Sequence, residues 1–360
     1  MYRILVINPG STSSKIAVFT DEAEVYSINI AHTLAELAPY PHVADQHILR
    51  RDAVFRALSE AAIHIEHLGA VVGRGGMLRP IPSGVYRVNQ RMLDDLQRPG
   101  GREHISNLGA PIAYEIASAA GIPAFIVDPV VVDEFEPLAR VAGLPDCVRR
   151  SEGHMLSLKA AARRAAQELG HAYDEINLVV AHLGSGISVS AHRRAAIVDI
   201  NCGLDGTGPF SPERAGGLPV GEVMRLAFSG QYTHDELYQL VTRRAGLVAY
   251  LGTNDAREVE RRIARGDERA RLIYEAMAYQ IAKEIGLMST VLRGDVQAIV
   301  LTGGLAPSRM LVGWISERVA WIAPLLIYPG ELEMSAMAQG ALRVLRGEEE
   351  AKEYYPWEMT

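Results

Sequence analysis

The sequence predicts an α/β fold of two domains, each a sheet covered by helices. Short β-rich runs alternate with longer segments of helical periodicity along the chain. The chain has 360 residues, more than one hydrophobic core usually supports, and 48% of them are apolar, enough for two cores. A strand–turn–strand pattern at Gly10 returns at Gly184, which indicates a weak internal duplication of two half-molecules.

The individual elements follow from runs of apolar and β-branched residues bounded by turn residues, and from helical spacing between them. Alanine-rich stretches such as 160–167 favour helices with small side chains that pack closely on a sheet. The predicted strands are 4–7, 16–19, 24–30, 70–72, 124–127, 178–183, 187–191, 196–200, 298–301 and 325–328. The predicted helices are 44–65, 108–120, 154–169, 220–228, 267–292 and 334–346, with another beginning near Pro307. We expect the domain boundary near 149–153, before a long helix.

Charge and cysteine content exclude several classes of partner. The formal net charge of −7 leaves no basic surplus to attract nucleic acid or an anionic membrane. Two cysteines, Cys147 and Cys202, are too few for a disulfide framework or a cysteine metal site and fit a reducing compartment. Because the chain begins with a strand and has no apolar run of about eighteen residues, we expect a cytoplasmic protein.

The first turn, 8–15, reads Asn-Pro-Gly-Ser-Thr-Ser-Ser-Lys between two strands. Its tip offers backbone N–H groups, hydroxyls, an amide and one cation, which suit a phosphate. The spacing is not that of a Walker loop, and a strand rather than a helix follows, so an ordinary hairpin turn is the alternative. The candidate phosphate ligands here are Asn8, Gly10, Ser11, Thr12, Ser13 and Lys15.

Two later glycine turns extend this pattern. A second hairpin turns at 184–186, and a buried strand ends at 302–304 ahead of a helix. Glycines at a strand-to-helix crossover let a flat or phosphorylated ligand lie against the backbone. Two facing hairpins and this third turn predict nucleotide chemistry in a cleft, with an adenosine pocket at the third. The candidate residues are His182, Gly184, Ser185, Gly186, Thr302, Gly303 and Gly304, although His182 also fits a buried, hydrogen-bonded role.

Two charged residues end strands of the first half. Arg74 lies between glycines, where a planar guanidinium can hold a carboxylate or phosphate through two hydrogen bonds, or form an ordinary salt bridge. Asp128 lies where a metal ligand or general base often sits, but Asp before Pro129 is also a common turn.

Four further polar residues are candidates on position alone. His154 precedes a helix, where a lone histidine is more often structural than catalytic. Arg214 is the cation of 205–217, a run so rich in glycine and proline that we expect a ligand-carrying loop. Glu331 and Glu333 precede the last predicted helix, where they either bind a metal or favour the helix N-terminus.

These motifs, in this order, resemble the acetate and butyrate kinase family, a branch of the fold shared by actin, sugar kinases and Hsp70 chaperones. The most specific mark is 6–15, Val-Ile-Asn-Pro-Gly-Ser-Thr-Ser-Ser-Lys, and 72–76 and 80–89 look like the butyrate kinase subgroup. The resemblance covers nearly the whole chain. It implies two duplicated actin-like (ribonuclease H-like) α/β domains around a nucleotide cleft: 1–150 with about 334–360, and the nucleotide-binding 151–333.

The resemblance also implies roles for single residues. Arg74 would hold the acyl carboxylate, Asp128 would lie near the transferred phosphoryl group, and His154 and Arg214 would stabilise the transition state. Magnesium would be held by Glu333, or alternatively Glu331, with Asn8 and Asp128. The two hairpins correspond to the family's phosphate motifs, and 302–305 to its adenosine motif.

Three departures from acetate kinases bear on specificity. Ser185 replaces an asparagine, and Leu158 replaces a second histidine, which weakens the case for a histidine pair. Gly153 replaces a phenylalanine that narrows the acyl pocket, so we expect room for a longer chain, each extra buried CH₂ being worth about 0.8 kcal/mol.

The implied reaction is reversible, ATP- and Mg²⁺-dependent phosphorylation of butyrate, or a related short or branched fatty acid, to the acyl phosphate and ADP. A carboxylate acceptor is already anionic at neutral pH and needs no general base, but the approach of two anions requires a site rich in cations. The alternatives are an acetate or propionate kinase, a sugar kinase, or a non-catalytic nucleotide switch. The family resemblance also implies a homo-oligomer, dimeric or higher.

Overall fold

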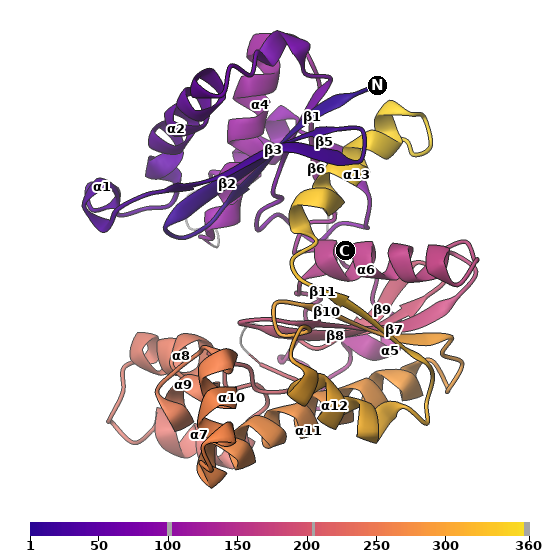
Figure 1. Cartoon of the computed structure of the whole chain (residues 1–360). Coiled ribbons are helices and arrows are strands. Elements are labelled where there is room, and N and C mark those ends of the chain that lie inside the picture. Colours follow the sequence, from indigo (N-terminus) through magenta and orange to yellow (C-terminus); the bar gives the residue numbers. More distant parts are fainter. Residues whose placement is uncertain (99–102, 204–205, 356–360) are drawn as a thin grey trace. The chain divides into compact units, whose positions relative to one another are not determined.

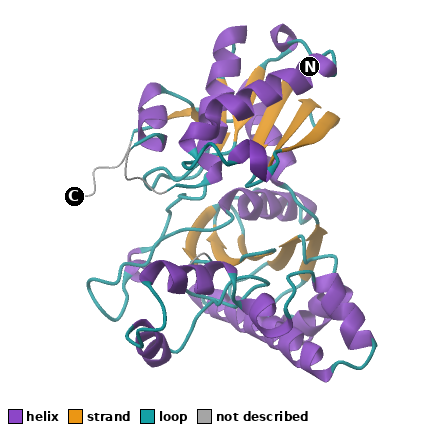
Figure 2. Cartoon of the chain, turned by 90° about the vertical axis from the view of Figure 1, so that its left-hand side faces the viewer, coloured by secondary structure: helices purple, strands orange, loops and turns teal. Residues whose placement is uncertain are grey.

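The computed structural model describes residues 1–98, 103–203 and 206–355. The chain forms two compact units: Met1–Val132 with Leu332–Thr360, and Asp133–Glu331 (Figure 1). Each unit is a mixed β-sheet with helices on both of its faces (Figure 2). The predicted α/β class is therefore confirmed.

The first unit contains a seven-stranded sheet in the order β12-β5-β6-β4-β1-β2-β3. β1, β2 and β3 form an antiparallel meander, and β4 and then β6 continue the sheet parallel to β1. The strands are β1 (Arg3–Pro9), β2 (Ser13–Thr20), β3 (Ala23–Ala31), β4 (Ala70–Gly73), β5 (Val85–Arg87), β6 (Ala124–Val127) and β12 (Lys352–Glu353).

Helices cover both faces of this sheet. The helices are α1 (Leu34–Leu37), α2 (His47–Glu60), α3 (Gln90–Leu96), α4 (Gly109–Ala120) and α13 (Glu333–Leu345). Leu5 and Ile7 of β1 share one buried cluster with residues of α2 and α4. On the other face, α13 packs so closely that a Cβ at Gly340 would lie 2.6 Å from Val127 of β6.

The second unit contains a five-stranded sheet in the order β11-β10-β7-β8-β9. Helix α6 packs on β7 and β10, and α11 and α12 cover the opposite face. The strands are β7 (Asn177–Leu183), β8 (Ile187–Arg193), β9 (Ala196–Ile200), β10 (Ala298–Gly303) and β11 (Leu325–Pro329). The helices are α5 (Pro137–Arg140), α6 (Met155–Glu168), α7 (Val220–Ala227), α8 (His234–Arg243), α9 (Gly246–Leu251), α10 (Ala256–Ala264), α11 (Glu268–Val291) and α12 (Arg309–Val319).

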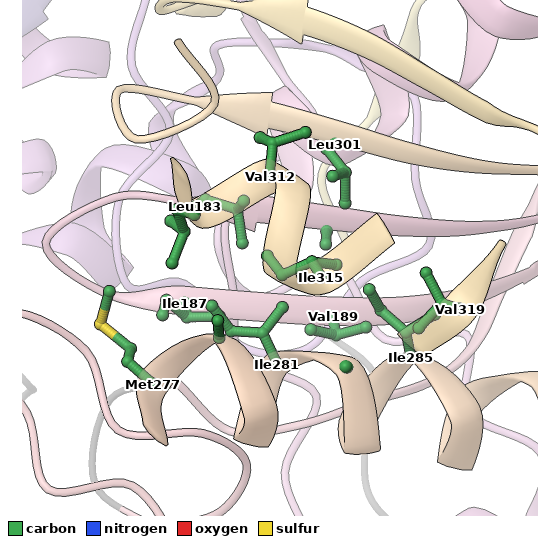
Figure 3. Packing of buried hydrophobic residues seen from close by; sticks show 14 of the residues in the cluster. Leu183, Ile187, Val189, Met277, Ile281, Ile285, Leu301, Val312, Ile315 and Val319 are labelled. Atoms are coloured by element: carbon green, nitrogen blue, oxygen red, sulfur yellow. The ribbon is translucent and has the colours of Figure 1, made fainter. Parts of the chain in front are cut away.

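The core of the second unit lies between its sheet and α11. Met277, Ile281 and Ile285 recur at helical spacing on α11, and they pack with Ile187 and Val189 of β8 (Figure 3). All five side chains are essentially inaccessible to solvent. This packing provides a rigid base for the β7–β8 hairpin.

The two sheets share one topology. The order β9-β8-β7-β10-β11 repeats β3-β2-β1-β4-β6, with two antiparallel pairs followed by two parallel pairs in each. Each meander begins with a hairpin whose turn is one of the predicted phosphate motifs. The duplication predicted from two short motifs thus extends to five strands.

The boundary between the units differs from the expected one. The sequence predicted it near 149–153, whereas the first unit ends at Val132. The intervening segment is bonded to the second unit: Glu134 pairs with Lys159 of α6 at 2.7 Å, and Arg149 pairs with Asp199 of β9 at 2.8 Å. These two ion pairs join the segment 133–149 to the second unit.

Some elements also differ from the predicted ones. The helix predicted at 44–65 is divided, because a 3₁₀ turn at Ala44–Gln46 precedes α2 and Ala62 has a φ of 52° beyond its end. β5, β12 and several short helices were not predicted. Within the part of the chain that the structure describes, no helix is both long enough and apolar enough to span a bilayer.

Candidate functional site

The β1–β2 turn is a tight hairpin with an exposed tip. The Gly10 N–H donates to Ser13 O at 2.7 Å, and the side chains of Ser11 and Thr12 are exposed. Asn8 and Lys15 lie directly opposite each other on the two strands. Because opposite residues share one face of a hairpin, the amide and the ammonium group lie on the same side of the turn.

A buried arginine that sequence reasoning missed lies beneath this turn. Arg50 of α2 is fully buried, and its guanidinium donates to the carbonyl oxygens of Gly10, Ser11 and Ser13 at 2.9 to 3.0 Å. Burial lowers the pKa of the Arg50 guanidinium to about 10, so it stays charged at neutral pH. Nothing in the sequence near Arg50 distinguishes it from the other arginines of α2.

Arg74, Asn8 and Glu333 meet at one edge of the first sheet. β1 and β4 are parallel neighbours in which Ile7 is paired with Gly73, so the next residues, Asn8 in β1 and Arg74 after β4, lie side by side. Glu333 begins α13, and its Oε2 accepts from Arg74 Nη1 at 2.6 Å and from Asn8 Nδ2 at 2.8 Å. Gly73 is required here, because a Cβ would lie 2.1 Å from the Gly109 carbonyl oxygen.

Asp128 follows β6 in a strained backbone conformation. Its φ is 37°, in the left-handed region that non-glycine residues rarely adopt. The side chain is buried, and its Oδ1 accepts from the Gly84 N–H at 2.8 Å. Strain of this kind costs on the order of 1–3 kcal/mol and concentrates at functional sites.

Two histidines stack in the second unit. His154 lies just before α6, and its ring is parallel to that of His182 with the centroids 4.0 Å apart. His154 Nδ1 is 2.9 Å from the Ser188 hydroxyl, and Ser188 is the cross-strand partner of His182. A histidine pair is therefore present, although Leu158 occupies the position where the sequence comparison sought one.

Gly153 is closely packed. A Cβ there would lie 2.6 Å from Ile200 Cδ1 and 3.1 Å from the Ser188 hydroxyl. The room that the sequence predicted beside Gly153 for a longer acyl chain is therefore occupied by the Ile200 side chain.

The side chain of Arg214 packs against the second hairpin. A Cβ at Gly186 would be 2.3 Å from Arg214 Nη1, so only glycine leaves room for the guanidinium. Nη1 donates to the Gly203 carbonyl at 2.6 Å, and the Ser211 hydroxyl ties the loop to Ser185 O at 2.5 Å. The predicted loop begins at residue 205, which lies outside the described residues.

A cavity of about 800 Å³ adjoins this hairpin, within the second unit. Gly184 and Ser185 line one part of it, and Gly304 lines another. Thr302 is buried in β10 instead, and Gly303 has a φ of 98° with no room for a Cβ against Leu183. Three more lining residues lie in segments that the sequence singled out, namely Pro212, Glu213 and Leu305. The remaining lining residues were not predicted: Asn254, Asp255, Ala256, Arg257, Glu260, Pro307 and Ser308. The volume is in the range of small-molecule sites.

The predicted magnesium ligands Asn8, Asp128 and Glu333 all belong to the first unit. Among residues 1–98, 103–203 and 206–355, no group of three or more His, Cys, Asp and Glu side chains could hold an ion. Mg²⁺ is usually held by one or two carboxylates together with substrate phosphates and waters. Glu333 and Asp128, with the Asn8 amide, fit that requirement. Glu331 is exposed and is the last residue of the second unit.

Comparisons with known proteins give one family match and several similar structures. The Acetokinase family matches residues 144–313, which form most of the second unit. The acetate kinase of Porphyromonas gingivalis is 18% identical with a TM-score of 0.79, over 96% of this chain and 100% of that one. The propionate kinase of Francisella tularensis subsp. tularensis is 19% identical with a TM-score of 0.72, over 94% and 99%.

A more distant similarity extends to another family. A ROK family protein from Streptococcus pneumoniae is 14% identical with a TM-score of 0.50, over 96% of this chain and 100% of that one. At such identities these similarities show the fold alone. They confirm that both units have the actin-like α/β fold.

Proposed function

We propose that this chain, whose residues 144–313 match the Acetokinase family, is a carboxylate kinase. It would transfer the γ-phosphoryl group of ATP to a short-chain fatty acid, reversibly, forming an acyl phosphate and ADP. The observation that carries the proposal is that the Arg214 guanidinium packs against Gly186 of the second hairpin, while the two residues before Gly186, Gly184 and Ser185, line the cavity. A fixed cation at the edge of a nucleoside-sized cavity is what phosphoryl transfer requires.

The second unit would hold most of the nucleotide. Its cavity would receive adenosine, and the Gly184–Gly186 turn would lead the phosphates toward Arg214. His154, oriented by Ser188 and stacked on His182, would donate a hydrogen bond to the transferred group. The exposed tip of the first hairpin and Lys15 would bind the terminal phosphates from the first unit.

Arg74 would hold the acceptor. Its Nη1 pairs with a carboxylate oxygen, that of Glu333, at 2.6 Å, which supports a carboxylate as the ligand of this guanidinium. Glu333 and Asp128 with Asn8 would hold Mg²⁺, which when bound neutralises charge on the β- and γ-phosphates. The acyl carboxylate would then replace Glu333 on Arg74.

The reaction itself needs no general base. A carboxylate oxygen forms the new bond to the γ-phosphorus, the bond to the β–γ bridging oxygen breaks, and the electron pair leaves with ADP. Negative charge is crowded on the equatorial oxygens in the transition state. Arg214, Arg74 and His154 supply the preorganised positive groups and donors that stabilise it.

We further propose that the acyl group is butyrate or a related short or branched chain. This rests on the resemblance of 72–76 and 80–89 to butyrate kinases. Because Ile200 fills the space beside Gly153, we assign chain-length selection to these two residues together. Acetate or propionate is the alternative substrate.

Trapping with hydroxylamine tests the proposal. The protein is incubated with ATP, Mg²⁺ and acetate, propionate, butyrate or isobutyrate, and acyl hydroxamate is measured. We expect hydroxamate with every acid and the highest kcat/KM with a four-carbon acid. A sugar-dependent release of ADP without hydroxamate would indicate a sugar kinase, and ATP turnover indifferent to any acceptor would indicate a nucleotide switch. Either result rejects the proposed function.

A further inference from the structure

Arg50 is a buried cation with which no carboxylate of the described residues forms an ion pair. Its side chain is completely inaccessible, yet all of its hydrogen-bond acceptors are neutral oxygens. Three are the turn carbonyls, and the others are Gln46 Oε1 at 2.9 Å from Nη2 and the Ser14 hydroxyl at 3.2 Å from Nη1. No Asp or Glu in the described ranges pairs with it. A buried charge without an ionic partner is costly, and buried charges in proteins are usually paired or bound to an ion.

The guanidinium also fixes the direction of the turn's amides. A trans peptide places its C=O and N–H on opposite sides, and no cis bond occurs in the described chain. Since Arg50 holds the carbonyls of Gly10 and Ser11, the next N–H groups, those of Ser11 and Thr12, face away from it. Ser11 and Thr12 are exposed, so these N–H groups are directed toward the ligand side of the turn.

We propose that Arg50 is a positioning residue for polyphosphate: it sets the first hairpin with its amides outward, and its charge is balanced by the bound phosphates. This inference rests on the proposed function, because it assigns the phosphates of the nucleotide to this hairpin. Arg50 does not touch the ligand. It acts through the backbone of the turn and through the electrostatic field of its guanidinium group, which lies beneath the turn.

Lysine cannot take this role. The planar guanidinium presents donors in a fixed fork, and here the fork reaches three carbonyls and Gln46 at once. An ammonium group has three donors on a single nitrogen at the end of a flexible stem. Arg50→Lys therefore keeps the charge and loses the fork, whereas Arg50→Met loses both. Arg56, exposed on the same helix, provides the matched control as Arg56→Met.

The test is calorimetric titration of the full chain with tripolyphosphate and, separately, with adenosine. We expect Arg50→Lys to weaken tripolyphosphate binding about tenfold and Arg50→Met to weaken it more, with adenosine affinity unchanged in both. Arg56→Met should match the wild type for both ligands. Equal tripolyphosphate affinity in the wild type and Arg50→Lys would overturn the inference.

Hydrogen exchange of the wild type provides a readout that requires no variant. Tripolyphosphate should slow exchange of the Ser11 and Thr12 amides, and unchanged exchange there would overturn the inference even if a variant fails to fold. The proposed function fails separately: if tripolyphosphate protects these amides but no acyl hydroxamate forms, Arg50 keeps its role. If Arg50→Lys forms hydroxamate with an unchanged KM for ATP, this inference fails alone.

Discussion

At the scale of single residues, the proposed turnover depends on the Arg214 guanidinium, which packs against the second hairpin. Removing one preorganised donor aimed at developing charge lowers kcat by about a hundred- to a thousandfold. We therefore expect Arg214→Ala to lose turnover by that factor while ATP binding, measured by calorimetry, stays close to that of the wild type. Arg225→Ala, in which an exposed arginine of α7 is removed, controls for loss of charge. Unchanged turnover in Arg214→Ala would remove Arg214 from the mechanism.

Gly186 offers an independent test of the same contact. A Cβ at this position would displace the Arg214 guanidinium, which is the movable end of a flexible side chain. We expect Gly186→Ala to lower kcat about tenfold or more at little expense of stability, and to have no further effect when combined with Arg214→Ala. The control is Gly286→Ala on α11, where a Cβ would meet no atom within 4 Å. Additive losses in the double variant would contradict the contact.

The residues that sequence reasoning found and missed differ in the kind of contact they make. Asn8, Arg74 and Arg214 lie in motifs whose local glycines indicate a ligand, so their positions could be predicted. Arg50 acts on a turn 36 to 40 residues away in sequence, and no local pattern encodes that contact. The stacking of His154 on His182 likewise depends on tertiary packing.

At the scale of elements, β8 carries a histidine that links stability to pH. His192 is fully buried, with Nδ1 2.7 Å from the Tyr173 hydroxyl and Nε2 2.8 Å from the Ser190 hydroxyl. Burial, followed by the charges of Lys159 and Arg163, lowers its pKa well below 6.5. Below about pH 6.5 the unfolded chain therefore binds a proton that the folded chain does not, and stability decreases as pH falls.

The expected slope is up to about 1.4 kcal/mol per pH unit for this one group. The free energy of unfolding, measured with urea between about pH 7 and about pH 5, should fall more steeply with decreasing pH in the wild type than in His192→Gln. The difference in slope should correspond to the uptake of about one proton on unfolding. Other groups such as His32, whose pKa is also lowered by burial, contribute equally to both curves. Parallel curves would show that His192 is protonated in the folded state.

The elements themselves could be predicted where the chain was long and periodic. β7 is buried along its whole length and contains the apolar, β-branched run 178–181, which is easily assigned as a strand. β5 has three residues, too few for any period to appear. α10 is dominated by charged residues, and its start is marked only by the Asp255 side chain, which accepts from the Arg257 N–H.

At the scale of the whole molecule, the two units differ in chain continuity. The second unit is one segment, Asp133–Glu331, whereas the first is completed by the C-terminal Leu332–Thr360. Sequence reasoning predicted the second unit but placed its start at 151, since the pairing of Glu134 and Arg149 with residues beyond 150 leaves no local signal. A continuous segment with its own core can fold without the rest of the chain.

We therefore expect the fragment 133–331 to unfold cooperatively on heating and to bind adenosine with the affinity of the full chain, because the cavity is formed by its residues alone. It should form no acyl phosphate, since Asn8, Arg74 and Glu333 belong to the first unit. Gly304→Phe would fill the cavity from a position with no neighbouring atom within 4 Å, and Gly313→Phe on α12 is equally unhindered but does not line it. Adenosine binding should be lost in Gly304→Phe and kept in Gly313→Phe. Binding by both variants would place adenosine elsewhere. A fragment 133–331 without a cooperative transition would show that the second unit needs the first to fold.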